Sequence, residues 1–335
     1  MNRQKLVIPD SPSVFKAVRE GFDAVTNHLT LLLFPVGLDL LLWFGPHVRV
    51  KKQIETLIRE MNNFSAANSP EMVEMITAGK EIWSAAAERI NLLAALRSYP
   101  IGIFSLLSSM FPVRHPLGRP SFVEISGPGE ILGLVIVLSL GGLVLGTLYF
   151  SAVKSAALED RIRWINLFQK WPWQGAQALV LGLICLAVFL AVLVFGTCLV
   201  TGMALIDPAF ARIGLLGMGI LFTWLFFPLF FSPHGIFTRR LNAWQSVVES
   251  MKLANLTFMK TGFFILLVVL ITQGLDVLWQ TPPEDSWLML VSILGHSFIT
   301  TGVLAASFVY YQEMVFWVRE IQALQELSLS PEEKF

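Results

Sequence analysis

Two aspartates stand inside otherwise apolar runs and are the residues of this sequence best suited to chemistry. They lie in Gly37-Leu38-Asp39-Leu40-Leu41-Leu42-Trp43 and Gly274-Leu275-Asp276-Val277-Leu278-Trp279. An ionised carboxylate in such surroundings costs about 2.5–3.5 kcal/mol on membrane-insertion scales unless it faces protein or water. One interpretation is that Asp39 and Asp276 line an outward-facing polar cavity that binds a cation, a proton or a basic group. The other is that they reach interfacial water, or tie the outer helix ends to His47, Arg49 or backbone amides.

His296 is the histidine that lies deepest in an apolar run, within Gly295-His296-Ser297. If its depth matches that of the two acids, it can hydrogen bond to Asp276 or Asp39. The alternative is a packing role or an ordinary hydrogen bond between helices. We therefore include it with the two aspartates as a cavity candidate.

Gly142 and Gly146 form a small-xxx-small pattern in another apolar run. Such a pattern allows two helices to approach closely, although it is common in membrane helices. The two glycines are our helix-contact candidates.

The usual catalytic and metal-binding patterns are absent from the sequence. It contains no Gly-x-Ser-x-Gly elbow, no His-Glu-x-x-His and no phosphate-binding Gly-rich loop. Cys185 and Cys198 fall in one apolar run, about 20 Å apart if it is helical, which is too far for a disulfide. We therefore expect a non-enzymatic protein with no metal and no cofactor.

The composition is that of an integral membrane protein. Of 335 residues, 55% are hydrophobic and 14% are charged, and the mean hydropathy is +0.65. A soluble protein usually carries about 25% charged residues. The formal net charge is zero, so no overall field attracts nucleic acid, and we expect no such partner.

Six apolar runs approach or exceed the roughly 20 residues that a helix needs to cross a bilayer. They are 25–44, 131–153, 177–205, 213–231, 262–280 and 288–312. Amphipathic stretches at 14–27, 161–174 and 241–259 precede the odd-numbered runs and are typical of interfacial helices. We predict an all-α membrane protein of six transmembrane helices, arranged as three hairpins, with a helical outer subdomain.

The basic residues of the short connections alternate along the chain. Those assigned to one side are Arg3, Lys5, Lys16, Arg19, Lys154, Arg161, Arg163, Lys170, Arg239, Arg240, Lys252, Lys260, Arg319 and Lys334. On the other side, the third connection has only Arg212, and the fifth, 280–287, has none. The positive-inside rule then predicts cytoplasmic N- and C-termini in a prokaryotic inner membrane.

The chain divides into three regions on this topology. Residues 1–44 form a cytoplasmic interfacial helix and the first span, 45–130 an outer helical segment, and 131–335 a five-span bundle with a cytoplasmic tail. The run 101–111 is bounded by prolines and is too short to span, so we expect an interfacial or re-entrant piece. The outer segment is interpreted as a helical cap over the bundle or as a docking or gating subdomain.

The last hundred residues resemble a group of known membrane domains. The resemblance is carried by the stretch 241–256, LNAWQSVVESMKLANL, and by 298–306, FITTGVLAA, continuing to Tyr310-Tyr311. These are similar to uncharacterised prokaryotic polytopic domains found beside glycerophosphodiester phosphodiesterases. The resemblance implies a cytoplasmic helix that enters the next span. It implies no site residues, and the phosphodiesterase domain has no counterpart here.

Two main classes of function follow as expectations, and a lipid-modifying or proteolytic enzyme is a third alternative. The first is a scaffold, assembly or accessory component of a membrane complex, with membrane lipids, other proteins or a second copy as partners. The alternative is a transporter or channel for a small solute, lipid or cation that uses Asp39 and Asp276.

Overall fold

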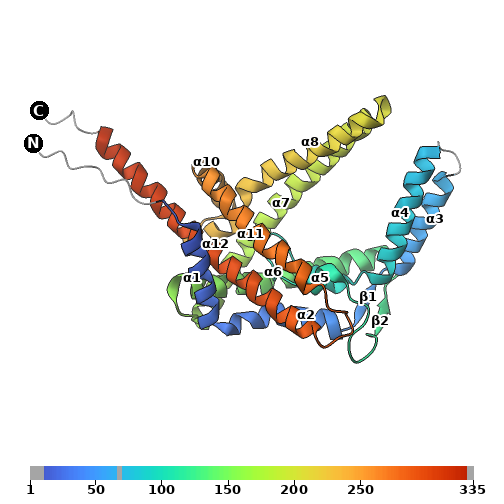
Figure 1. Cartoon of the computed structure of the whole chain (residues 1–335), viewed down its shortest axis with the longest axis horizontal. Helices are drawn as coiled ribbons and strands as arrows, with labels where there is room; N and C mark the ends of the chain where they lie inside the picture. Colours follow the sequence, from blue (N-terminus) through green and yellow to red (C-terminus); the bar gives the residue numbers. More distant parts are fainter. Residues whose placement is uncertain (1–10, 66–69, 330–335) are drawn as a thin grey trace, which may run out of the picture. The chain divides into compact units, whose positions relative to one another are not determined.

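The computed structural model describes residues 11–65 and 70–329 of the chain, which are almost entirely α-helical (Figure 1). The all-α fold predicted from the apolar runs is therefore confirmed. Arg3, Lys5 and Lys334, three of the residues behind the predicted orientation, lie outside the described residues.

Five helical stretches are long and apolar enough to cross a membrane, so the chain is a multi-pass membrane protein. They are α6 (Pro128–Glu159), α7 (Trp164–Ile206), the stretch Ala209–Arg239, α11 (Phe258–Trp279) and α12 (Met289–Leu329). The third of these consists of α8 (Pro208–Phe226), η3 (Phe227–Leu229) and α9 (Ser232–Arg239). Proline at 228 and 233 explains the interruption, because a proline has no N–H to donate to the helical ladder.

The predicted first span is short. It consists of η1 (Leu29–Leu32) and α2 (Leu33–Phe44), which together fall below the ~20 residues of a full crossing. The amphipathic helix α1 (Val14–Asn27) joins it through a bend of 88°. The number of spans is six only if this bent pair counts as one.

The other predicted interfacial stretches differ from each other. Residues 241–259 contain a separate helix, α10 (Ala243–Leu256), capped by the side chain of Asn242, which accepts from the N–H of Gln245 at 2.8 Å. The stretch 161–174 does not form a helix of its own. It is the first part of α7, which continues through Pro172 into the apolar run.

The outer segment contains two long helices and a small sheet. The helices α3 (Lys51–Ser65) and α4 (Pro70–Arg89) pack against each other through Val50, Ile54 and Ala87. Strand β1 (His47–Arg49) pairs in parallel with β2 (Phe122–Glu124), with His47 opposite Phe122. The sequence did not predict these strands, which have three residues each. The remaining short elements are η2 (Leu92–Leu96) and α5 (Leu107–Met110).

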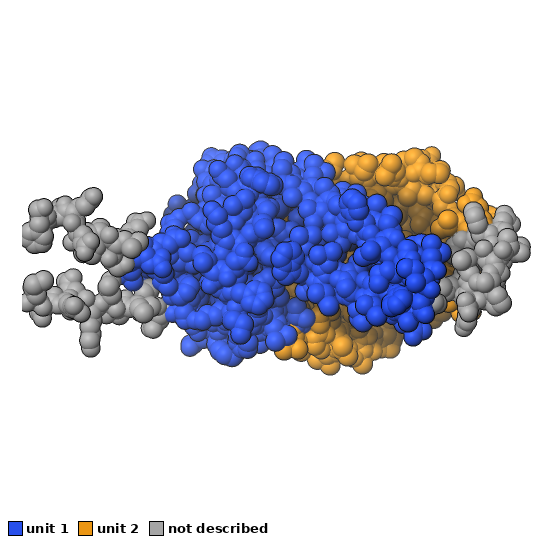
Figure 2. Space-filling model, turned by 90° about the horizontal axis from the view of Figure 1, so that it is seen from above, with its two compact units in different colours: residues 1–28, 150–269, 302–335 blue, residues 29–149, 270–301 orange. Residues whose placement is uncertain are grey.

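The chain packs as two compact units, coloured separately in Figure 2. Unit 1 consists of residues 1–28, 150–269 and 302–335, and unit 2 of residues 29–149 and 270–301. The boundaries fall inside α6, α11 and α12. Each unit is therefore built from stretches far apart in sequence, unlike the consecutive regions 1–44, 45–130 and 131–335.

Unit 1 is organised around the C-terminal part of α12. The rings of Phe264 and Tyr310 stack at 4.4 Å with an interplanar angle of 2°, and Phe231 packs beside them. Gly21 of α1 lies against the backbone of Ala306, where a Cβ would clash. Within the most apolar window of α12, 67% of residues are buried, compared with 6–17% in the other four spans.

Unit 2 contains a non-helical stretch, residues 97–106, that lies against α6. A Cβ on Gly142 would lie 2.7 Å from the carbonyl carbon of Leu96, and one on Gly146 would lie 2.5 Å from the Cα of Gly102. Ile101, Ile103 and Leu106 are buried. The stretch predicted as interfacial or re-entrant therefore reaches the middle of the apolar part of α6.

This contact predicts opposite effects for two alanine substitutions in α6. Gly142→Ala should lower stability by about 1–3 kcal/mol, because the new methyl group overlaps the Leu96 backbone. Gly133→Ala should leave stability unchanged or raise it by up to about 1 kcal/mol, since nothing lies within 4 Å of its Cβ position and alanine favours a helix. Thermal unfolding of both variants in detergent would check this. Equal melting temperatures would contradict the close packing.

Candidate functional site

The carboxylate of Asp39 is completely buried in unit 2 and saturated with hydrogen bonds. The hydroxyl of Ser105 donates to Oδ1 at 2.5 Å, the N–H of Leu107 donates to Oδ1 at 3.0 Å, and the N–H of Leu106 donates to Oδ2 at 3.2 Å. These donors belong to the end of the non-helical stretch and the start of α5. Asp39 thus joins α2 to a segment 66 or more residues away in sequence.

Asp276 and His296 lie together in the same unit. Nδ1 of His296 is 2.8 Å from Oδ1 of Asp276, which joins α11 to α12. The His296 side chain is 95% buried (5% exposed), and its Nε2 has no hydrogen-bond partner among the described residues. His296 is also close enough to Asp39 for electrostatic attraction.

The three cavity candidates are therefore neighbours, although they come from three helices. Asp39 is held by hydrogen bonds within the protein, whereas the Asp276 side chain is 22% exposed. The arrangement pairs a partly exposed carboxylate with a buried imidazole, two groups that recur along ion and proton pathways in membrane proteins. That these residues line an open cavity remains a prediction.

Gly142 contacts Leu96, the last residue of η2, and Gly146 contacts Gly102 of the non-helical stretch. Because the two glycines have no side chains, Leu96 and Gly102 can lie directly against them. The sequence predicted that another segment packs closely against these glycines, but it could not identify that segment.

Glu284 is a residue of this region that the sequence analysis did not single out. Its carboxylate pairs with Arg89 at 3.1 Å and accepts from the N–H of Val113 at 3.2 Å. Its backbone carbonyl accepts from Nε1 of Trp43 at 2.8 Å. The connection 280–287 is thereby tied to the outer segment and to the end of α2. The available signal was a pair of acids, Glu284 and Asp285, in a short connection without basic residues.

His47 fastens the beginning of the outer segment to α2. Its Nε2 lies 3.2 Å from the carbonyl oxygen of Leu42, while the buried Nδ1 has no partner among the described residues. Burial lowers the pKa of His47, because removing the ring from water disfavours its charged form. The neutral ring therefore fits this position.

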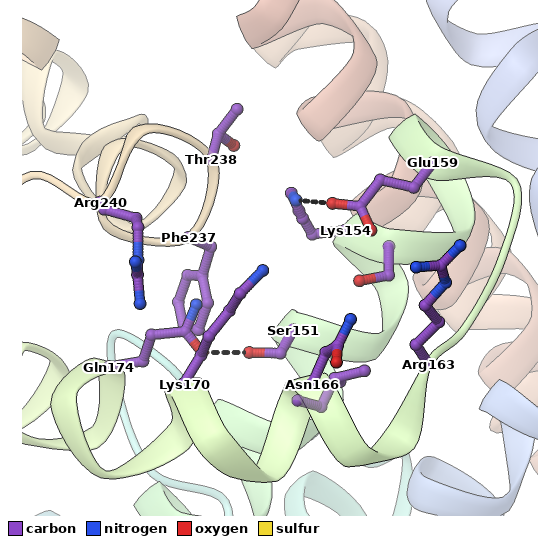
Figure 3. Close-up of a pocket in the computed structure, with 12 residues that line it drawn as sticks. Ser151, Lys154, Glu159, Arg163, Asn166, Lys170, Gln174, Phe237, Thr238 and Arg240 are labelled. Atoms are coloured by element: carbon purple, nitrogen blue, oxygen red, sulfur yellow. Dashed lines mark hydrogen bonds and ion pairs between the residues drawn. The ribbon is translucent and has the colours of Figure 1, made fainter.

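A second candidate site is a pocket of about 110 Å³ in unit 1 (Figure 3). The end of α6, the first turns of α7 and the end of α9 form it. Its lining residues are Ser151, Lys154, Ser155, Glu159, Arg163, Asn166, Leu167, Lys170, Gln174, Phe237, Thr238 and Arg240. The hydroxyl of Ser151 donates to Oε1 of the buried Gln174 at 2.7 Å, which joins α6 to α7 beside the pocket.

The pocket carries four cations and one carboxylate. Lys154 is paired with Glu159. Arg163, Lys170 and Arg240 have no ion-pair partner within residues 11–65 and 70–329. Sequence analysis counted these basic residues for topology and did not bring them together as a site, because Arg240 lies 70 residues after Lys170, in a different connection.

Groups of three or more His, Cys, Asp or Glu side chains that could hold a metal ion are not found in the part of the chain that the structure describes. The chemistry that these sites offer comes from side chains and backbone: a carboxylate–imidazole pair in unit 2 and a basic pocket in unit 1.

The Asp39 hydrogen bonds predict a large loss of stability on truncation. Asp39→Ala leaves two buried backbone N–H groups and the Ser105 hydroxyl without their acceptor, at about 1–3 kcal/mol for each unsatisfied group. Asp207→Ala is the matched control, because the exposed Asp207 only caps α8 by accepting from the N–H of Ala209 at 2.7 Å. That cap is worth about 0.5–2 kcal/mol. Thermal unfolding and limited proteolysis around 98–110 would check this, and equal effects would contradict the anchoring role.

Comparison with known proteins supplies no relative for this chain. No family model, no curated protein and no solved structure matches it. The resemblance of residues 241–256 and 298–306 to polytopic membrane domains therefore stays a prediction, and no residue role comes from a relative.

Proposed function

We propose that this chain is a non-enzymatic scaffold, assembly or accessory component of a membrane complex, and that the α7–α8 hairpin provides its contact surface. The observation that carries the proposal is the small share of this hairpin that the chain itself buries. In the most apolar windows, 11% of residues of α7 and 6% of the α8–α9 stretch are buried.

The hairpin is held together by its own contacts. The rings of Phe189 and Phe222 meet edge to face at 5.7 Å. Gly196 lies close to the side chain of Met218. The two helices run side by side in Figure 1 and are each other's main packing partners. The hairpin is thus a defined element whose outer faces are left free by the described residues.

Those outer faces combine bulky and small residues. Phe195, Leu216 and Ile220 are 77%, 71% and 71% exposed. Gly202 and Gly217 have nothing within 4 Å of their Cβ positions. Lipid can cover bulky side chains, but small residues also allow another helix to approach closely. The carboxylate of Asp39 is already bound by three donors of the chain itself, so it is poorly placed to bind a transported solute. Both observations favour a role in contact over a role in transport.

A transporter or channel is the second candidate, and the Asp276–His296 pair favours it. Ionisable residues inside membrane helices often mark ion or proton pathways. Here a partly exposed carboxylate meets a buried imidazole with a free ring nitrogen, near the carboxylate of Asp39.

The contact role predicts protein crosslinks from the hairpin. A photoreactive phenylalanine analogue at position 195, 216 or 220 should give adducts with another protein or a second copy in native membranes. The same analogue in place of Leu181, which is fully buried on α7, should give only adducts within the chain. Mass spectrometry of the adducts is the measurement. Lipid adducts alone, at all three exposed positions, would overturn the contact role.

The transport role predicts loss of flux in two variants that spare the Asp39 anchor. Asp276→Asn and His296→Gln should each reduce solute or cation flux in proteoliposomes at least tenfold, the size of effect expected when a proton-carrying group is lost. Gel filtration would confirm that both variants remain folded. Unchanged flux, or no flux in the wild-type protein, would dismiss this candidate.

A further inference from the structure

The pocket between α6, α7 and α9 has more positive charge than its own carboxylate can balance. Figure 3 shows Arg163, Asn166 and Lys170 on the start of α7, with Arg163 on the side of Glu159 and Arg240 on the opposite side of the pocket. Lys154 faces the same space from α6 and is paired with Glu159. Three cations, Arg163, Lys170 and Arg240, therefore line one pocket without an anionic partner among the described residues, and an anion bound there would offset their mutual repulsion.

The start of α7 adds to this positive field. The helix has 43 residues, and its N-cap, Arg163, provides no side-chain hydrogen bond to the first turn. The positive end of a helix attracts anions, and its free N–H groups can bind phosphate. Arg163, Asn166 and Leu167 of this first turn line the pocket.

Arg240 is held in a conformation that arginine does not favour. It follows α9 with φ 54° and ψ 37°, the left-handed conformation that glycine usually supplies at the end of a helix. The left-handed conformation costs a residue with a Cβ about 1–2 kcal/mol. Glycine would adopt this conformation without strain, but the residue at this position is a cation that lines the pocket. The hydroxyl of Thr238, also in the lining, is buried without a partner among the described residues.

The sequence places the pocket at the level of lipid headgroups. Lys154 follows directly after the apolar run 131–153, and the run 177–205 begins just after Gln174. Trp164 and Trp173, both partly exposed, flank the cations on α7. Tryptophan favours this boundary, and basic pockets between membrane helices bind phosphate headgroups.

We propose that this pocket is a binding site for a phosphate group, with Arg163, Lys170 and Arg240 as its cations and the first turn of α7 as its backbone donor. The group can belong to an anionic phospholipid or to a soluble phosphate compound. The proposal is independent of the contact role of the α7–α8 hairpin.

The test measures binding of three probes to the purified full chain in detergent: short-chain phosphatidylglycerol, short-chain phosphatidylcholine and inorganic phosphate. Lys170→Gln should weaken binding of the phosphate probe about fivefold, and Arg163→Gln with Lys170→Gln about 25-fold, at roughly a factor of five for each cation. Arg161→Gln is the matched control, because Arg161 is exposed in the same connection but does not line the pocket. It should change the apparent Kd by less than about twofold.

Arg240→Gly separates a ligand role from a structural one. It removes the cation and also relieves the left-handed conformation, so the melting temperature without ligand should stay the same or rise, while binding weakens about fivefold. Preference for phosphatidylglycerol identifies a lipid headgroup, and equal or stronger binding of inorganic phosphate identifies a soluble ligand. The proposal fails if no probe binds, or if Arg161→Gln weakens binding as much as Lys170→Gln.

Discussion

A backbone that leaves the helical conformation inside an apolar bundle must find partners for its N–H groups, because no water is there to supply them. In unit 2 the carboxylate of Asp39 meets this requirement for Leu106 and Leu107 and also binds the Ser105 hydroxyl. This lets the preceding stretch lie against α6 at Gly142 and Gly146. A costly buried carboxylate and two glycines thus serve the same purpose: they hold a non-helical segment among helices.

The other polar groups of the two units are arranged on a similar principle. Along α12, the hydroxyls of Thr300, Thr301 and Ser307 donate to carbonyls of the same helix, as in Thr301 to Ser297 at 2.6 Å. Others join neighbouring elements: Thr301 also meets the Tyr149 hydroxyl at 2.8 Å, and Ser307 meets Nε2 of His234 at 2.7 Å. α12 is consequently the most buried span, while α7 and α8 contribute apolar surface outward. This division between an internal helix and an outward hairpin underlies the proposed contact role.

The Asp276–His296 pair and the basic pocket of unit 1 differ in their charge and in their surroundings. Asp276 and His296 form a carboxylate–imidazole pair between α11 and α12, close to the buried carboxylate of Asp39. The pocket of unit 1 gathers excess cations at the ends of the apolar runs, where long basic side chains reach water and headgroups. The two proposals therefore concern different ligands.

The apolar runs alone predicted α6, α11, α12 and the helical class, because a segment's ability to cross a membrane depends on its own composition. They also identified Asp39, Asp276 and His296, since a charge among apolar residues is visible locally. The partners were not visible: Ser105 for Asp39, Leu96 for Gly142, and the meeting of Arg163, Lys170 and Arg240. The short first span and the passage of α7 through Pro172 also came only from the structure. The composition of a segment determines its own tendency to form a membrane helix. Hydrogen bonds and pockets, in contrast, join residues that are far apart in the sequence, and the packing of the chain decides which of them meet.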